Sequence, residues 1–185
     1  RAQAFFSAGS TGACMSAATL IIGRLKGVIR PALATVVPSP VKPIVLLDVG
    51  ANADCKPEYL VQFAEMGRVY SQRIVGTENP TIALLNIGEE EEKGSMAAQE
   101  AHRALAAHVE GFSGNAEGND ILQATYDVIV TDGFTGNVAL KTIEGTAKAL
   151  FSALKRSMMS STKNKLAAAA LKPAFRELKG SLSSD

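Results

Sequence analysis

The chain has 185 residues, of which 46% are hydrophobic and 20% are charged, a composition typical of a globular domain with a sizeable core. Its formal net charge of +1 argues against a general nucleic-acid-binding surface. Cys14 and Cys55 have neither metal-site spacing nor a disulfide framework, so we expect reduced thiols and a cytoplasmic location. No apolar run reaches the roughly 20 residues of a membrane-spanning helix.

Strands and helices alternate along the chain. A strand-like stretch over 4–6 is followed by a turn over 7–12 and by helical spacing of small and apolar residues. Further strands are predicted over 31–37, 44–47, 81–87, 111–115 and 128–130. Helices are predicted after Pro57, over 96–109 and from Thr135 to Leu150. This alternation predicts an α/β fold, a mostly parallel sheet wrapped by helices, with ligands bound beyond the carboxyl ends of the strands.

The stretch from Tyr126 to Lys141, YDVIVTDGFTGNVALK, holds the densest polar chemistry. An apolar strand is followed by a glycine-bearing turn and the start of a helix. Such a turn can hold a phosphate on backbone N–H groups, with Thr135, Asn137 or Lys141 as side-chain donors. Alternatively, Gly133 and Gly136 only serve the turn, while Asp132 and Asn137 cap the helix.

Polar loops follow other predicted strands as well. They cover residues 7–12, 48–52, 88–89, 114–115 and 132–137. If the sheet forms, these loops converge along one edge, which favours a binding or catalytic site over chance turn chemistry.

The sequence lacks the motifs that several enzyme classes require. Neither G-x-G-x-x-G after a strand nor a P-loop motif occurs, which argues against dinucleotide and P-loop nucleotide enzymes. His102 and His108 lie in a helical stretch and are interpreted as surface or packing residues, so neither a histidine triad nor a zinc site is expected. The four glutamates at 89–92 are typical of a solvated loop. The donors that remain suit an oxyanion or a phosphate.

Five blocks, in order, cover essentially the whole chain: SAGSTGA, RPALAT, LLDVGANADCKPEYLVQFAEMG, LLNIGEEEEKG and VTDGFTGNVALKTIEG. They resemble the phosphate acyltransferase family PlsX of bacterial phospholipid synthesis. The resemblance implies transfer of an acyl chain from acyl carrier protein to inorganic phosphate, giving acyl phosphate for a membrane-bound glycerol-3-phosphate acyltransferase. It also implies a fold similar to isopropylmalate dehydrogenases and phosphate acetyltransferases, and a homodimer associated peripherally with the membrane. No cofactor, metal or nucleic acid is expected.

Two departures from the family stand out. Ser10 replaces the usual asparagine and remains a hydrogen-bond donor. Family members also extend before Arg1, with a further strand and glycine-rich loop, and continue beyond Asp185. We therefore expect the chain to be part of a longer one.

Combining residues and resemblance gives a site hypothesis in which phosphate attacks the thioester directly, without a protein nucleophile. Asp48 and Asp132 orient donors, because a carboxylate facing phosphate would repel it unless it were paired with lysine. The catalytic candidates are Asn52, Lys56, Asp132, Asn137 and Lys141. The substrate-binding candidates are Ser7, Gly9, Ser10, Thr11, Gly12, Asp48, Gly50, Gly133, Thr135 and Gly136.

The C-terminal end is basic. Residues 155–179 contain seven lysines and arginines against Glu177 alone, a net charge of +6. Pro173 splits this segment into two helices, and we expect an α/β catalytic domain over 1–155 and a helical hairpin over 156–185. The hairpin could contact an anionic membrane or a second subunit through Leu166, Ala170 and Leu171, bind the acidic carrier protein, or pack on its own domain.

Two other functions stay open. A metal- and nicotinamide-dependent oxidoreductase of the related fold would have to assemble Asp48, Asp54, Asp120 and Asp132 around a divalent ion, although no spacing supports this. A noncatalytic scaffold would use the basic hairpin to dock enzymes at the membrane.

Overall fold

The computed structural model describes residues 7–182, so the strand expected over 4–6 lies outside the described residues. Within them, five strands form one sheet in the order β1-β2-β5-β3-β4. β1 pairs antiparallel with β2, and the other pairs are parallel, which confirms the predicted mostly parallel sheet. The strands are β1 (Ala34–Val37), β2 (Ile44–Leu47), β3 (Ile82–Leu85), β4 (Phe112–Ala116) and β5 (Val128–Val130).

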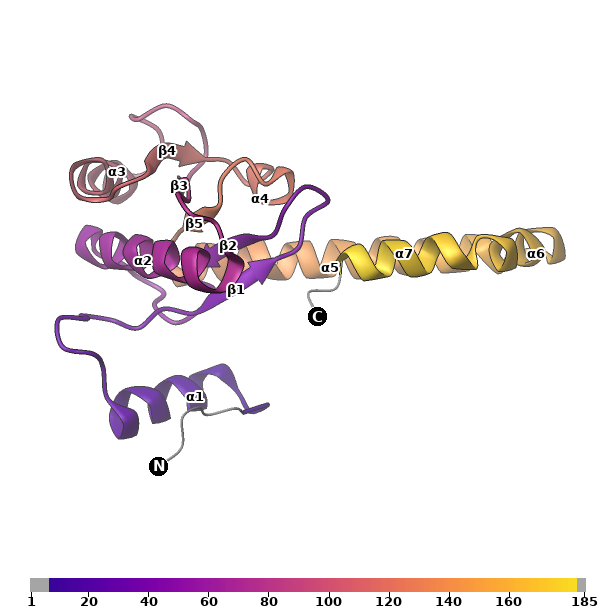
Figure 1. The fold of residues 1–185 in the computed structure, drawn as a ribbon, viewed down its shortest axis with the longest axis horizontal. Coiled ribbons are helices and arrows are strands. Elements are labelled where there is room, and N and C mark those ends of the chain that lie inside the picture. The colour runs from indigo at the N-terminus through magenta and orange to yellow at the C-terminus, as the bar shows by residue number, and fades with distance from the viewer. Residues whose placement is uncertain (1–6, 183–185) are drawn as a thin grey trace.

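Helices alternate with these strands. They are α1 (Thr11–Ala17), η1 (Ala18–Ile22), α2 (Pro57–Tyr70), η2 (Ser71–Val75), α3 (Met96–His108), α4 (Asp120–Gln123), α5 (Gly133–Met158), α6 (Thr162–Ala170) and α7 (Lys172–Leu182), η denoting π-helix. Pro57 starts α2, where its missing N–H costs nothing, as the sequence predicts. Figure 1 shows α5 running away from the sheet and the α6–α7 segment returning toward it.

Both faces of the sheet are covered, which explains the unbroken apolar runs of β2 and β5. On one face, Val45, Leu47 and Val128 pack with Phe63 of α2 and Leu105 of α3. On the other face, the core includes Ile44, Leu46, Ile129 and Ile121 of α4, with Ala139 and Ile143 of α5 against it. Only the first part of α5 therefore contributes to the core; from Gly145 to Ser157 every residue is exposed.

Two predictions about strand ends are corrected. Residues 31–33 are not part of β1, because the N–H of Leu33 donates to the side chain of Asp48. Gly114 and Asn115 lie inside β4 and do not form a loop after it. Asn115 is tolerated in a strand because its buried amide contacts Nδ1 of His102 at 3.0 Å and donates to the carbonyl of Glu90 at 2.8 Å.

Candidate functional site

Asp48 directly follows β2 and is fully buried, so its carboxylate requires compensating hydrogen bonds. Its Oδ1 accepts from the backbone N–H groups of Leu33, Gly50 and Ala51, at 3.1, 3.1 and 2.9 Å. Its Oδ2 accepts from the backbone N–H and the side-chain amide of Asn52, both at 2.8 Å. Asp48 thus fixes the loop after β2, and the N–H groups of this loop point at the carboxylate, where they cannot also hold a phosphate.

This loop packs closely on the first turn of α5. The N–H of Gly133 donates to the carbonyl of Asn52 at 2.7 Å, and a Cβ on Gly133 would stand 2.8 Å from that backbone. A Cβ on Gly136 would collide with the carbonyl oxygen of Asp48 and approach Thr131 Cγ2 to 2.7 Å. Both glycines are required here because two backbone segments from adjacent strands touch.

The N-terminus of α5 is capped by Asp132. Its carboxylate accepts the N–H of Thr135 at 2.8 Å and the hydroxyl of Thr135 at 2.7 Å. The capping alternative for Asp132 is therefore confirmed, whereas Asn137 lies in the second turn of the helix and is not a cap. The Thr135 hydroxyl proton is engaged by Asp132.

A small cavity of about 250 Å³ lies between this helix start and the β2 loop. Asn137 borders it, with its side-chain atoms 3.8 Å from the position of a Cβ on Gly50. Thr11 borders it from the start of α1. The complete lining is Thr11, Val49, Gly50, Ala53, Gly133, Phe134 and Asn137. A 26-residue helix presents its positive end to this cavity, which favours a small anion, while the capping carboxylate of Asp132 at the same end opposes it.

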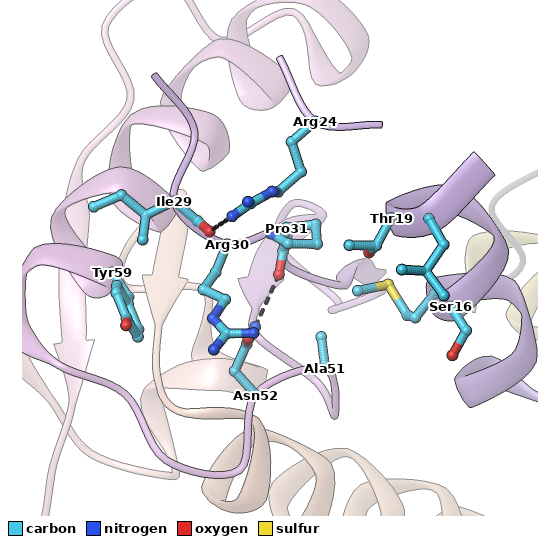
Figure 2. A pocket seen from close by; sticks show the side chains of 11 residues that line it. Ser16, Thr19, Arg24, Ile29, Arg30, Pro31, Ala51, Asn52 and Tyr59 are labelled. Atoms are coloured by element: carbon cyan, nitrogen blue, oxygen red, sulfur yellow. Dashed lines mark hydrogen bonds between the residues drawn. The ribbon is translucent and has the colours of Figure 1, made fainter. Parts of the chain in front are cut away.

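A larger cavity of about 570 Å³ lies on the other side of the same loop, where Ala51 and Asn52 form part of its wall. Figure 2 shows Arg24 and Arg30 at this cavity, with the guanidinium of Arg30 close to Asn52. Asn52 is held in place by donating to the carbonyl of Pro31 at 2.8 Å. The two cavities therefore share the loop that Asp48 fixes.

Arg24, Arg30 and Tyr59 were not among the sequence candidates. They come from the irregular segment before β1 and from the first turn of α2, neither of which is one of the predicted polar loops. The sequence does contain one indication of a basic site here: the stretch GRLKGVIRP carries Arg24, Lys26 and Arg30 and no acidic residue.

Cys55 follows the loop after β2, and its thiol is protonated at neutral pH. Burial, the nearby carboxylate of Asp48 and, to a smaller extent, those of Asp132 and Asp54 raise its pKa to about 11, against a weaker opposing effect of the Gly133 backbone. Its Sγ donates to the carbonyl of Asn52 at 3.5 Å. Because the thiolate is the nucleophilic form, Cys55 is not an activated nucleophile at neutral pH.

Several other candidates predicted from the sequence line neither of the two cavities. Lys141 does not line either one; its ammonium pairs with Glu144 at 3.0 Å. Lys56 is an exposed residue that precedes α2. Ser7, Gly9, Ser10 and Gly12 are exposed around the start of α1, where the hydroxyl of Ser10 accepts the N–H of Ala13 at 3.4 Å.

The remaining candidates are placed as follows. Asp120 belongs to α4, where it accepts from the N–H of Glu117 and the hydroxyl of Thr125. His102 is buried against Phe112 and His108 is exposed, so the packing and surface interpretations are both confirmed. Over residues 7–182, no three His, Cys, Asp or Glu side chains gather as metal ligands, and no helix is long and apolar enough to cross a membrane.

The helices at this end differ in their bounds from the hairpin expected over 156–185, because α5 continues unbroken across residue 155 and the returning segment breaks at Leu171, before Pro173. α5 ends at Met158, and α6 and α7 follow, separated at Leu171. Leu154 and Met158 of α5 border a hollow with Leu171 and Phe175 of the returning segment. Leu166 is 70% exposed and Leu171 is 53% exposed, and Ala170 is exposed beside them.

Comparison with known proteins gives a consistent result. The family described as "Fatty acid synthesis protein" matches residues 1–184. A "Phosphate acyltransferase" of Bacillus cereus strain B4264 is 52% identical over 179 residues, 96% of this chain and 54% of the relative. Proteins of the same name from Bacillus licheniformis and Clostridium botulinum strain Loch Maree are 51% and 49% identical, over 97% of this chain and 54% and 53% of the relatives. The chain spans about half the length of the curated relatives it matches.

Proposed function

The chain belongs to the fatty acid synthesis protein family, and from this premise we propose that it forms part of an enzyme that transfers an acyl group from acyl carrier protein to inorganic phosphate. The name of its relatives, phosphate acyltransferase, supports this function over an oxidoreductase or a noncatalytic scaffold. The single structural observation that carries the proposal is the small cavity at the start of α5, bordered by Thr11 and Asn137.

In this mechanism, inorganic phosphate occupies the small cavity. Thr11 and Asn137 donate hydrogen bonds to it, and the positive end of α5 favours its charge. Asp48 and Asp132 act as positioning residues, because Asp48 ties down the loop after β2 and Asp132 fixes the first turn of α5. Asp48 has its charge compensated by five donors, which moderates its repulsion of a neighbouring anion.

The reaction is a direct displacement. A phosphate oxygen attacks the thioester carbonyl carbon, the C–S bond breaks, and the thiolate of the carrier leaves as acyl phosphate forms. The protonated thiol of Cys55 supports a route without a covalent acyl-enzyme. Such a reaction is accelerated by holding the two substrates side by side and by stabilising the tetrahedral oxyanion.

The test is phosphate-dependent release of free carrier protein from palmitoyl-acyl carrier protein, measured with the chain at its natural ends. We expect Asn137→Ala to lower the rate by roughly tenfold to a hundredfold, the effect of losing a hydrogen bond to a charged group. Lys148→Ala is the control, since it lies on the same helix, farther from its start, and is 81% exposed. A parent enzyme that forms no acyl phosphate from any acyl chain would refute the proposal.

We also propose that residues 156–185 mediate contact with an anionic membrane surface and with a second subunit, near the glycerol-3-phosphate acyltransferase that uses the product. Two observations support this: the +6 charge of residues 155–179, and the exposure of Leu166 and Leu171, with Leu150 and Phe151 exposed on the adjoining part of α5. Apolar and cationic side chains on one helical element suit the interface of an anionic bilayer.

A further inference from the structure

The larger cavity has a chemical character different from that of the small one. Its volume, about 570 Å³, lies within the roughly 300–1,000 Å³ range of organic ligand sites, whereas the small cavity, at about 250 Å³, falls below this range. Its wall combines Met15, Leu20 and Ile29 with the hydrogen-bonding side chains of Thr19, Asn52 and Tyr59. A purely aliphatic chain would offer no partner to the hydroxyls of Thr19 and Tyr59 or to the side-chain carbonyl of Asn52, whose NH₂ group already donates to Pro31 and Asp48. An amide-containing ligand would satisfy them.

The charge of this cavity is entirely positive. Arg24 and Arg30 line it, and none of its eleven lining residues is acidic. In the part of the chain that the structure describes, the ion pairs found include neither arginine. The guanidinium of Arg24 donates to the carbonyl of Ile29, which fixes the segment that carries Arg30, and the side chain of Arg30 extends toward Asn52 (Figure 2). Two guanidinium groups without a carboxylate partner suit a phosphate group.

We propose that Arg24 and Arg30 bind the phosphate ester of the amide-containing arm on which a carrier protein presents its thioester. This inference rests on the proposed acyl transfer and names the part of the donor that the larger cavity recognises. The arm lies along Thr19, Asn52 and Tyr59, with its phosphate ester on the far side of the loop of Ala51 and Asn52 from the small cavity, and its thioester end reaches past this loop to the inorganic phosphate. One cavity thus takes the ester phosphate and the other takes free phosphate.

The deciding experiment is calorimetric binding to the full-length protein, with 4′-phosphopantetheine and unphosphorylated pantetheine as probes. We expect the phosphorylated probe to bind at least about tenfold more tightly, and Arg30→Gln to remove roughly that factor without affecting pantetheine. Arg30→Lys should recover only part of it, because lysine lacks the two-pronged donor geometry. Lys26→Gln is the matched control: it removes one positive charge from the same segment but does not line the cavity.

Other outcomes would overturn the inference. These are equal binding of the two probes, equal effects of Arg30→Gln and Lys26→Gln, or tighter binding of decyl phosphate than of 4′-phosphopantetheine. In steady-state kinetics, Arg30→Gln should raise KM for the acyl carrier protein and leave KM for phosphate unchanged; the reverse would assign the arginines to free phosphate. If the parent binds the phosphorylated probe through Arg30 but transfers no acyl group, the proposed function fails and the binding inference stands.

Discussion

The carbonyl oxygen of Asp48 occupies the space in which Gly136 would carry a side chain. Asp48 ends one strand and Gly136 lies in the helix after the neighbouring strand, so this contact sets the distance between the two loops of the candidate site. The contact joins backbone to backbone, and a larger residue could be accommodated only by moving one of the two segments.

Gly136→Ala should therefore destabilise the protein and lower its activity. We expect a loss of about 1–3 kcal/mol in the free energy of unfolding, the usual effect of overpacking, measured by urea denaturation. Gly145→Ala, farther along α5, meets no atom within 4 Å and should stabilise the helix by about 0.4–1 kcal/mol. Equal effects of the two substitutions would contradict the role given to Gly136.

Asp48→Asn tests the carboxylate that holds the loop. An asparagine oxygen could accept only some of the five hydrogen bonds, and its NH₂ group would face the donors of Asn52. Leaving buried donors unpaired should cost about 1–3 kcal/mol of stability, and acyl transfer should fall with it. Asp54→Asn, an exposed change in the same segment, should stay within about 0.5 kcal/mol of the parent. Unaltered unfolding of Asp48→Asn would rule out this anchoring role.

The sequence predicted the sheet well and the hydrogen bonding of the site less well, for physical reasons. Strands such as Ile44–Leu47 are continuous apolar runs because helices cover both their faces, so they can be recognised locally. The polar loops at Asp48 and Asp132 did converge, because the strands that carry them are adjacent and parallel. Which N–H groups remain free depends on contacts between distant segments, and these the sequence does not reveal.

Three examples make this concrete. The carboxylate of Asp48 accepts a hydrogen bond from the N–H of Leu33, fifteen residues away. The loop after β2 therefore depends on a distant segment, and its local sequence does not indicate this. Asn115 was expected in a loop because polar residues are common there, but His102 and Glu90 satisfy it inside β4. Arg24 and Arg30 belong to an irregular segment without periodicity, so only the folded chain reveals that they border a cavity.

Cys55→Ala should preserve acyl transfer, since the thiol is protonated and the proposed mechanism has no acyl-enzyme. Its folded pKa of about 11 lies above the ordinary value of 9.0, so the unfolded chain loses this proton first as pH rises. Stability should therefore decline between pH 9.0 and about 11 in the parent, and less steeply in Cys55→Ala. Denaturation across this range measures the difference. An acyl group trapped on Cys55 and seen by mass spectrometry would refute the direct mechanism.

Asp127 provides a test at acidic pH. Burial alone would raise its pKa, but hydrogen bonds from Lys42 at 2.6 Å and from Thr81 outweigh burial and lower it. The resulting stability is complete above the unfolded pKa of about 3.9 and is lost as pH falls toward the lower folded pKa. Asp127→Asn should cost about 1–3 kcal/mol at neutral pH and flatten the loss of stability below about pH 4. Glu78→Gln, an exposed change, should leave the acid profile as in the parent.

Leu166→Glu should release the protein from vesicles that contain anionic lipid, if the helical hairpin contacts membranes. Leu166 is 70% exposed and does not border the hollow between the helices, so its replacement should leave the free energy of unfolding within about 0.5 kcal/mol. Leu171 borders that hollow, so Leu171→Glu should perturb the hairpin as well.

Leu122→Glu, on the exposed side of α4, controls for adding one negative charge elsewhere. In vesicle sedimentation at low and high salt, Leu166→Glu should bind less than the Leu122→Glu control. Sedimentation velocity should report any change in subunit association. Undiminished vesicle binding by Leu166→Glu would exclude this leucine from the membrane contact.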